Sequence, residues 1–441
     1  MSNNLKVRAA RGGIYMASIT FALRPVSMGL AILLARLLVP KDFGLMALAM
    51  ILVNAANYFT DMGMRPTVVQ TKEDINKVAH YAFVIVMVTS TLFTVFAAMT
   101  AAPLAKALGG GPELVPILRW MSLYVALDGL WIIPEALLRR NLKFKQLGLV
   151  SIPAELSSTL IAIPLAMMGY GPWSLVVGQL LGQVVRIVIL WAYARPWIWL
   201  HPQKWDLPII KGMFHYGLPS MAGGMTKYFQ NQIDTLLVGR NLGPATVGIY
   251  NKAYVLTTRL ADMLTTSIFG NVLFPSYSKM QDEKPRLTRA YLLSTRMVVL
   301  IIMPMALGLA VTAPILVPVL LGPQWVPMIP IWQIFSLYGL TRPISTNAAP
   351  LFSAIGQPRR NLTASIVLLS VMVPALLLLI GPYDAIGAAV AVSLANVVAM
   401  LFNVWQVNQV LPGTAVRTGV ESLPFFLAGG LMVLGVMASQ S

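Results

Sequence analysis

Long apolar stretches recur along the whole chain of 441 residues and exclude an ordinary soluble fold. Hydrophobic residues make up 57% of the sequence and charged residues only 11%, whereas soluble domains carry about 25% charged residues. A membrane-spanning helix needs about 20 mostly apolar residues. Segments that meet this requirement lie at 12–38, 43–64, 79–102, 114–136, 147–168, 172–194, 213–239, 246–274, 290–320, 328–353, 362–380 and 384–410, with a further apolar stretch at 423–438. The sequence therefore predicts an all-α polytopic membrane protein.

The second half of the chain repeats two motifs of the first half. Arg36–Gly44 and Arg240–Gly248 both read R-x-L-x-P-x-x-x-G, and Arg-Arg-Asn-Leu occurs at Arg139–Leu142 and at Arg359–Leu362. All four segments lie between long apolar stretches. Many transporters are built from two related membrane halves around a central site. The repeat therefore predicts two pseudo-symmetric six-helix bundles around a central cavity, and it favours a carrier.

The expected organisation has a bundle on each side of a short linker. The N-terminal bundle is expected at 1–200 and the C-terminal bundle at 212–412, joined by an interfacial linker at 201–211. Residues 413–441 are expected to form a partial or additional C-terminal membrane segment. No loop is long enough to bury a core of its own, so any chemistry must take place within the bilayer or at its edges.

The distribution of Lys and Arg predicts the topology. The formal net charge is +17, and most cations lie in alternate short loops, which is the pattern of cytoplasmic loops in membrane proteins. The N-terminus, with Lys6, Arg8 and Arg11, is therefore expected in the cytoplasm. This placement also favours anionic membrane lipids over nucleic acid as the partner of the positive charge.

The sequence predicts no cofactor and no metal site. It contains no cysteine, and its three His (His80, His201 and His215) are scattered, so they form no ligand pattern. A membrane enzyme such as a polysaccharide polymerase or ligase would need a sizeable loop with acid–base groups, which this sequence lacks. A non-enzymatic function is favoured.

Ionisable residues inside the predicted spans are candidates for function, because charge in a bilayer is costly. Polar residues recur every three or four positions on several spans, which places them on one face of each helix. These stripes are Asn54, Asn57, Tyr58 and Asp61; Tyr124, Asp128, Trp131 and Glu135; Ser151, Glu155 and Ser158; Gln179, Gln183 and Arg186; Lys227, Asn231 and Asp234; and Lys252, Arg259 and Asp262. They predict a shared hydrated cavity.

The repeat suggests roles for some of these residues. Arg24 and Lys227 occupy corresponding mid-membrane positions in the two halves, and two cations that face one cavity suit an anion such as a phosphate. The predicted substrate-binding residues are Arg24, Lys227, Arg259, Arg342 and Asn231. A carboxyl group in a low-dielectric medium can titrate near physiological pH. The predicted carriers of H⁺ or Na⁺ are therefore Asp234, Asp128, Glu155 and Asp262.

Structural roles compete with these interpretations. Arg24 and Lys227 could serve only in internal ion pairs, and Asp61, Glu135 and Arg186, near helix ends, suit snorkelling or capping. In the repeated R-x-L-x-P-x-x-x-G motif, Pro suits the first turn of a helix and Gly permits close packing. The paired arginines at 139–140 and 359–360 are interpreted as topology determinants.

Several segments resemble a known family. They are Gly12-Gly13 with Arg36–Gly44, Ala136–Phe144, Gly169–Leu175, Phe274–Lys279 and Gly356–Pro358. In the order and spacing of these segments the chain resembles the multidrug/oligosaccharidyl-lipid/polysaccharide (MOP) exporter superfamily. Within that superfamily it is most similar to the bacterial polysaccharide transporters, the Wzx (WzxC-like) flippases.

The resemblance implies a flippase of the bacterial inner membrane. It would transport polysaccharide units, for example in lipopolysaccharide biosynthesis. It would move an isoprenoid-diphosphate-linked oligosaccharide from the cytoplasmic to the outer leaflet by alternating access. A gradient of H⁺ or Na⁺ or the membrane potential would drive it, and polysaccharide assembly proteins are candidate partners. The open alternatives are a multidrug exporter or a lipid II flippase of the same superfamily, a scramblase, and, less favoured, a polymerase or ligase.

Overall fold

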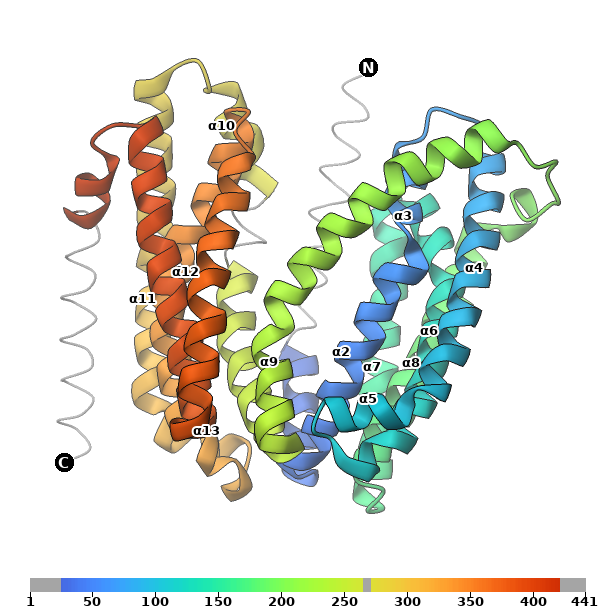
Figure 1. The fold of residues 1–441 in the computed structure, drawn as a ribbon, viewed down its shortest axis with the longest axis horizontal. Helices are drawn as coiled ribbons and strands as arrows, with labels where there is room; N and C mark the ends of the chain where they lie inside the picture. Colours follow the sequence, from blue (N-terminus) through green and yellow to red (C-terminus); the bar gives the residue numbers. More distant parts are fainter. Residues whose placement is uncertain (1–24, 265–270, 421–441) are drawn as a thin grey trace. The chain divides into compact units, whose positions relative to one another are not determined.

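The computed structural model describes residues 25–264 and 271–420, and these residues are α-helical without any β-strand. The helices are α2 (Pro40–Asp61), α3 (Met64–Gln70), α4 (Ile75–Met99), α5 (Ala101–Ala107), α6 (Gly111–Arg140), α7 (Phe144–Met167), α8 (Pro172–Ala194), α9 (Leu207–Leu264), α10 (Asn271–Lys279), α11 (Lys284–Leu320), α12 (Ile329–Ala354) and α13 (Arg359–Val410), with short 3₁₀ turns at Pro196–Ile198 and Pro323–Met328. Figure 1 shows their course. The predicted segment 423–438 and most of the first predicted span lie outside the described residues.

Seven of the described helices are long and apolar enough to cross a bilayer, which confirms a multi-pass membrane protein. They are α2, α4, α6, α7, α8, α11 and α13. Helix α8 has the bounds predicted from the sequence. Helices α2, α4, α6 and α7 begin three or four residues earlier than predicted, because their first turn precedes the apolar stretch from which each span was predicted. Pro40 occupies the first turn of α2, and the Asp74 side chain accepts a hydrogen bond from the Asn76 backbone amide at the start of α4.

Two of the long helices each contain a break where the sequence predicts a pair of spans. The break in α9 is at Gly243, with φ 81° and ψ 176°. The break in α13 is at Asp384, with φ 49° and ψ −135°. Such backbone angles are not helical. The predicted pair 213–239 and 246–274 therefore corresponds to α9 as far as Leu264, and residues 265–270 lie outside the described residues. The pair 362–380 and 384–410 corresponds to α13.

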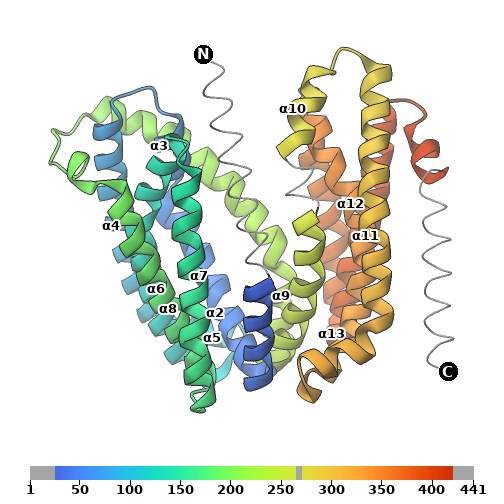
Figure 2. The same ribbon diagram turned by 180° about the vertical axis from the view of Figure 1, so that it is seen from behind.

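The chain divides into two compact units, residues 1–248 and 249–441. In the first unit α6 is the central helix: 72% of its most apolar stretch is buried, against 17–44% in α2, α4, α7 and α8. Helix α6 packs against α2, α3, α4, α5, α7 and α8, which lie around it in Figures 1 and 2. Its residues Ile132 and Ile133 share an apolar core with Tyr81 and Val86 of α4.

In the second unit α12 packs against α10, α11 and α13, and Figure 2 shows α11 and α12 side by side. The core at the α10 end contains Tyr277 of α10, Tyr291 of α11, and Leu351 and Phe352 of α12. In each unit a short helix thus packs on a long one: α3, like α5, on α6 in the first unit, and α10 on α12 in the second.

The two copies of the R-x-L-x-P-x-x-x-G motif pack against each other inside the first unit. A Cβ atom on Gly44 would overlap the carbonyl oxygen of Pro244, and one on Gly248 would overlap the carbonyl oxygen of Pro40. The contact is reciprocal, because each glycine meets the backbone of the other motif's proline. The structural interpretation of the motif is therefore confirmed: both glycines permit two helix starts to touch through their backbones.

Candidate functional site

Polar stripes from three helices of the first unit meet at Asp128 of α6. This carboxylate is only 3% exposed. It accepts hydrogen bonds from the Asn57 amide of α2, from the Gln183 amide of α8 at 2.5 Å and from the Trp131 indole at 2.6 Å. Three N–H donors satisfy the buried carboxylate, as a membrane interior requires, and they join α2, α6 and α8.

Trp131 is in turn contacted by two arginines. The guanidinium carbon of Arg65 lies 4.9 Å from the indole ring centroid, and that of Arg186 lies 5.2 Å from it. Both distances are typical of cation–π interactions. Arg65 also lies 3.6 Å from Glu135, whose other oxygen pairs with Arg139. We name Arg65, Asp128, Trp131, Glu135 and Arg186, with Arg139, the charged cluster.

A polar cavity adjoins the charged cluster. It has a volume of about 150 Å³ and is lined by Trp131, Glu135, Arg139, Leu147, Val150, Ser151, Arg186 and Leu190 of α6, α7 and α8. We call it the α6–α8 cavity. The Glu135 side chain is buried, and its Oε2 atom lies 3.6 Å from Arg65 Nε, an ion pair without a hydrogen bond. Both oxygens of this carboxylate are thus met by arginines, one by Arg139 and the other by Arg65.

The second unit holds a buried polar group of a different kind. Asn347 of α12 donates hydrogen bonds to Ser294 at 2.9 Å and to Thr295 at 2.5 Å, both on α11. The Tyr277 hydroxyl of α10 donates to Asn347 Oδ1 at 3.0 Å and lies 2.6 Å from Ser294 Oγ. We call these residues the neutral network. Burial raises the pKa of Tyr277 to about 12, so its hydroxyl remains a donor at physiological pH.

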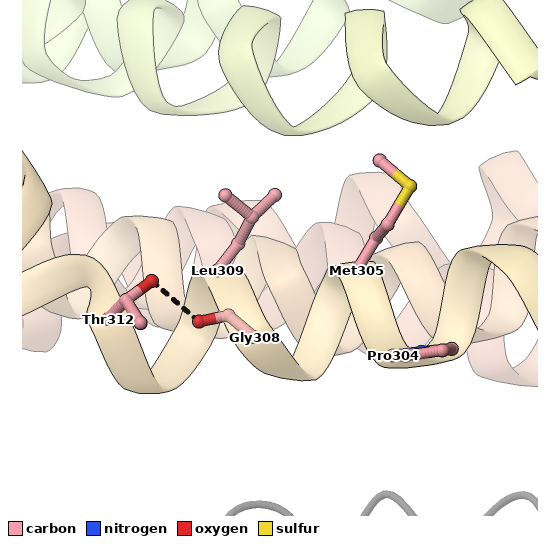
Figure 3. A pocket seen from close by; sticks show the side chains of 5 residues that line it. All are labelled: Pro304, Met305, Gly308, Leu309 and Thr312. Carbon is pink, nitrogen blue, oxygen red and sulfur yellow. Dashed lines mark hydrogen bonds between the residues drawn. The ribbon is translucent and has the colours of Figure 1, made fainter. Parts of the chain in front are cut away.

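A larger hollow of about 420 Å³ lies along α11 (Figure 3). Its walls are Pro304, Met305, Gly308, Leu309 and Thr312, and the only polar side chain, Thr312, donates to the Gly308 carbonyl oxygen at 2.6 Å. Since these lining residues include no ionisable group, this hollow offers no chemistry for an anionic headgroup. The α6–α8 cavity, although smaller, is the better candidate for polar recognition.

The predicted substrate-binding residues are only partly described. Lys227 and Asn231 are exposed on α9, which leaves them accessible to a ligand. Arg24 and the side chains of Arg259 and Arg342 lie outside the described residues. The assignment of these residues to substrate binding therefore stays a prediction.

The predicted ion carriers have contrasting surroundings. Asp234 is 4% exposed and accepts a hydrogen bond from the Thr235 backbone amide at 2.7 Å. Glu155 is exposed on α7, whereas Asp128 lies in the charged cluster. The side chain of Asp262 is outside the described part of α9. Their role in coupling stays a prediction.

The sequence interpretation missed the roles of Arg65 and Arg140. Arg140 Nη1 donates to the carbonyl oxygens of Val68, Val69 and Thr71, at 3.0, 3.1 and 2.8 Å. These are carbonyls at the C-terminal end of α3, which have no partner within the helix. Arg140 thus has a structural role in addition to its predicted topological role. Its partners lie about 70 residues away in sequence, so no local pattern indicates them.

Solved structures show the class of fold. A lipid II flippase, MurJ, in an inward closed conformation superposes with a TM-score of 0.74 and 14% identity, over 96% of this chain and 98% of that one. A multidrug resistance transporter of the MATE family in an inward-facing conformation gives a TM-score of 0.65 and 14% identity, over 97% and 100%. The fold is that of the MOP transporters.

Relatives identify the family within this class. Residues 33–330, more than half of the chain, match the family described as "Polysaccharide biosynthesis protein". The succinoglycan biosynthesis transport protein ExoT of Rhizobium meliloti (strain 1021) is 27% identical over 77% of this chain and 67% of that protein. The lipopolysaccharide biosynthesis protein WzxC of Escherichia coli (strain K12) is 22% identical over 96% and 86%. The chain belongs to this polysaccharide biosynthesis family.

Proposed function

We propose that the protein moves a lipid-linked oligosaccharide, the repeat unit of a polysaccharide, from the cytoplasmic to the outer leaflet of the bacterial inner membrane. The observation that carries the proposal is the family match over residues 33–330 together with a likeness to WzxC that extends over 96% of the chain. A relative named as a transport protein, ExoT, also favours a carrier over a polymerase or ligase.

The physical task of such a carrier is to take a diphosphate and its sugars through a medium in which charge is very expensive. Fixed cations can lower this cost if they meet the phosphates on both sides of a path. We assign this role to Arg24, Lys227, Arg259 and Arg342, with Asn231 as a neutral partner. Alternating access would then present these cations to each side of the membrane in turn.

Coupling to H⁺ or Na⁺ needs an ionisable group whose surroundings change during transport. Asp234 is our first candidate, because it is buried on the same helix as Lys227 and is 7 residues away in sequence. Asp128, Glu155 and Asp262 are the further candidates. The positive-inside distribution of Lys and Arg supports a cytoplasmic N-terminus and contact with anionic lipids, and polysaccharide assembly proteins are the expected protein partners.

Charge removal tests the substrate assignment. Arg24→Gln and Lys227→Gln should each leave expression near normal and sharply reduce polysaccharide export, because the diphosphate loses a counter-charge. Arg24→Lys should reduce export less, since the charge remains and only the bidentate geometry is lost. If Arg24 serves only an internal ion pair, Arg24→Gln should instead be unstable in detergent. Wild-type export from a well-folded double Gln variant would refute the phosphate assignment.

The coupling assignment is tested in proteoliposomes. Asp234→Asn should preserve the fold and weaken flipping driven by an imposed proton or sodium gradient, because the side chain no longer changes its charge. Downhill flipping without a gradient serves as the internal control. Gradient-driven flipping equal to that of the wild type would remove Asp234 from the candidates.

A further inference from the structure

The segment between α8 and α9, residues 195–206, folds back onto the first turns of α4. We call it the α8–α9 linker. The Trp205 ring stacks on the Tyr81 ring with the centroids 5.4 Å apart, and the Tyr81 hydroxyl donates to the carbonyl oxygen of Lys204. Tyr81 lies about 9 Å along α4 from the first residue of that helix. The linker therefore lies beside a membrane-spanning helix, and Figures 1 and 2 show it at the edge of the first unit.

Tyr81 is on the side of α4 that faces lipid. Four exposed apolar residues follow it by 7, 11, 14 and 18 positions, which places them on one face of the helix. They are Val88, Leu92, Val95 and Met99, each at least half exposed. Such an apolar stripe on a spanning helix contacts the acyl chains of the bilayer. Because Trp205 covers Tyr81, it continues the stripe to the end of α4.

The outward side of the linker combines apolar and positively charged side chains. Its apolar members are Trp197, Ile198, Trp205 and, at the start of α9, Leu207, each at least half exposed. Its cations are Arg195, Lys204 and Lys211, which are exposed and form no ion pair with a carboxylate among the described residues. We call these seven residues the linker surface. Asp206 is the one carboxylate between positions 195 and 211, so this stretch has an excess of two positive charges.

The depth of the linker fits the headgroup region of a bilayer. Helix α4 has 25 residues and is about 38 Å long, which exceeds the hydrocarbon core of about 30 Å. Its first turns, and the linker beside them, therefore lie at the level of the headgroups. Tryptophan is favoured at this level, and exposed lysines and arginines there attract anionic lipids. Water alone would suit the cations but not the apolar side chains.

We propose that the linker surface binds anionic phospholipid of the cytoplasmic leaflet. Its apolar side chains enter the boundary between headgroups and acyl chains, and its three cations hold the lipid phosphates. The cytoplasmic side follows from the distribution of Lys and Arg in the loops. The contact with anionic lipids in the proposed function thereby gains a location, and this location does not depend on the transported substrate.

Contact of the linker surface with each lipid can be measured with a single fluorescent label. The chain has no cysteine, so His201→Cys places a fluorophore at one exposed position of the linker. The labelled full-length protein is reconstituted in vesicles of equal parts phosphatidylglycerol and phosphatidylcholine. One of the two lipids carries a quenching nitroxide near the top of its acyl chain. Nitroxide phosphatidylglycerol should quench about twofold more than nitroxide phosphatidylcholine, and raised ionic strength should lower this ratio.

Substitutions in the linker surface separate the effect of charge from that of insertion. Lys204→Gln combined with Lys211→Gln should bring the quenching ratio close to one, because the attraction to the anionic lipid is lost. Trp205→Ser should reduce quenching by both lipids, since the linker loses its contact with Tyr81. Lys279→Gln combined with Lys284→Gln is the matched control. It removes the same charge from exposed positions outside the linker and should leave the ratio unchanged.

A label at the opposite end of α8 is the positional control. Tyr170 is exposed and lies in a loop without Lys or Arg, Gly169–Pro172. A fluorophore on Tyr170→Cys should therefore be quenched equally by the two lipids.

Three results would overturn the assignment. They are equal quenching of the His201→Cys label by the two lipids, quenching by neither lipid, and self-quenching between labelled copies without lipid quenching, which would assign the surface to a second copy of the chain. Flipping of a lipid-linked oligosaccharide is measured separately. If the wild-type protein flips this substrate but the linker shows no lipid preference, the lipid site is refuted and the flippase stands. A lipid preference without flipping would refute the proposed function and leave the lipid site.

Discussion

Two short helices, α3 in the first unit and α10 in the second, each pack on a long helix but are held by different chemistry. Each packs on the long helix at the centre of its unit, α3 on α6 and α10 on α12. Helix α3 is tied to α6 by charged side chains, with Arg65 beside Glu135 and Arg140 on the carbonyls that end α3. Helix α10 is tied to α11 and α12 by the uncharged groups of Tyr277, Ser294 and Asn347.

Among the described residues, this difference indicates that charged groups with a functional role are concentrated in the first unit. A neutral hydrogen-bonded network satisfies buried groups at little electrostatic cost. Buried charges must be paired and bonded to be tolerated, and they add little stability over well-packed apolar residues. A membrane unit that keeps Asp128, Glu135 and Arg186 is therefore expected to use them, whereas the neutral network is expected to be structural.

Removal of the Asp128 carboxylate should be the most damaging change to either network. Asp128→Ala leaves three buried N–H groups without an acceptor, which should cost about 3–5 kcal/mol. Asp128→Asn keeps one acceptor oxygen and should cost less. The free energy of unfolding in detergent, measured with a chemical denaturant, checks both values. Glu155→Ala, on the exposed face of α7, should change it by less than about 0.5 kcal/mol, and a similar loss in this control would contradict the account.

Disruption of the neutral network in the second unit should lower the free energy of unfolding by less, and the loss should not depend on salt concentration. Asn347→Leu has nearly the same shape and removes neutral hydrogen bonds to Ser294, Thr295 and Tyr277, so we expect a loss of about 2 kcal/mol. Unfolding should be measured at low and high ionic strength. The loss for Asn347→Leu should stay constant, whereas that for Arg139→Gln, which removes a half-exposed ion pair, should shrink as salt screens it. The opposite pattern would invalidate the division into charged and neutral networks.

A smaller and local effect is expected at Arg140. Arg140→Ala frees three carbonyl groups at the end of α3, which should destabilise that end by about 1–2 kcal/mol. Hydrogen exchange of the α3 amides should quicken by about tenfold or more, with little change in α10. Arg360→Ala is the matched control from the other copy of the motif, since Arg360 contacts the side chains of Gln357 and Gln409. Unchanged hydrogen exchange in α3 would show that Arg140 does not stabilise the C-terminal end of that helix.

The smallest effect concerns alkaline pH. Burial raises the pKa of Tyr277 to about 12 from an ordinary value of 10. The fold therefore favours the neutral phenol, and this stabilisation is complete below pH 10 and is lost as the pH rises toward 12. At pH 10 the loss is only about 0.4 kcal/mol, because the unfolded tyrosine is then half-ionised. Denaturant unfolding between pH 8 and pH 11 should show this slope reduced in Tyr277→Phe. An identical slope in both proteins would mean that Tyr277 is not protected by burial.

Helix bounds and polar stripes could be predicted because they depend on neighbouring residues. Contacts between residues far apart in the sequence could not. The bounds of α8 follow from apolar length with Pro172 at its start, and the stripes that contain Asp128 and Gln183 follow from helical periodicity. That these two residues bond to each other could not be predicted, because they lie 55 positions apart on different helices. The pairing of Glu135 with Arg65 is similarly distant, and capping by Arg140 depends on how α3 packs on α6.

The central claim is best tested by flipping in a defined membrane. Proteoliposomes that contain the purified protein and an isoprenoid-diphosphate-linked oligosaccharide on one leaflet are treated with a glycosidase or lectin that reaches only the outer surface. The account predicts that wild-type protein exposes the sugar much faster than empty liposomes do, and that a fluorescent phospholipid in the same vesicles is not transferred. Exposure at the rate of empty liposomes, or equal transfer of the phospholipid, would contradict an oligosaccharide-lipid flippase.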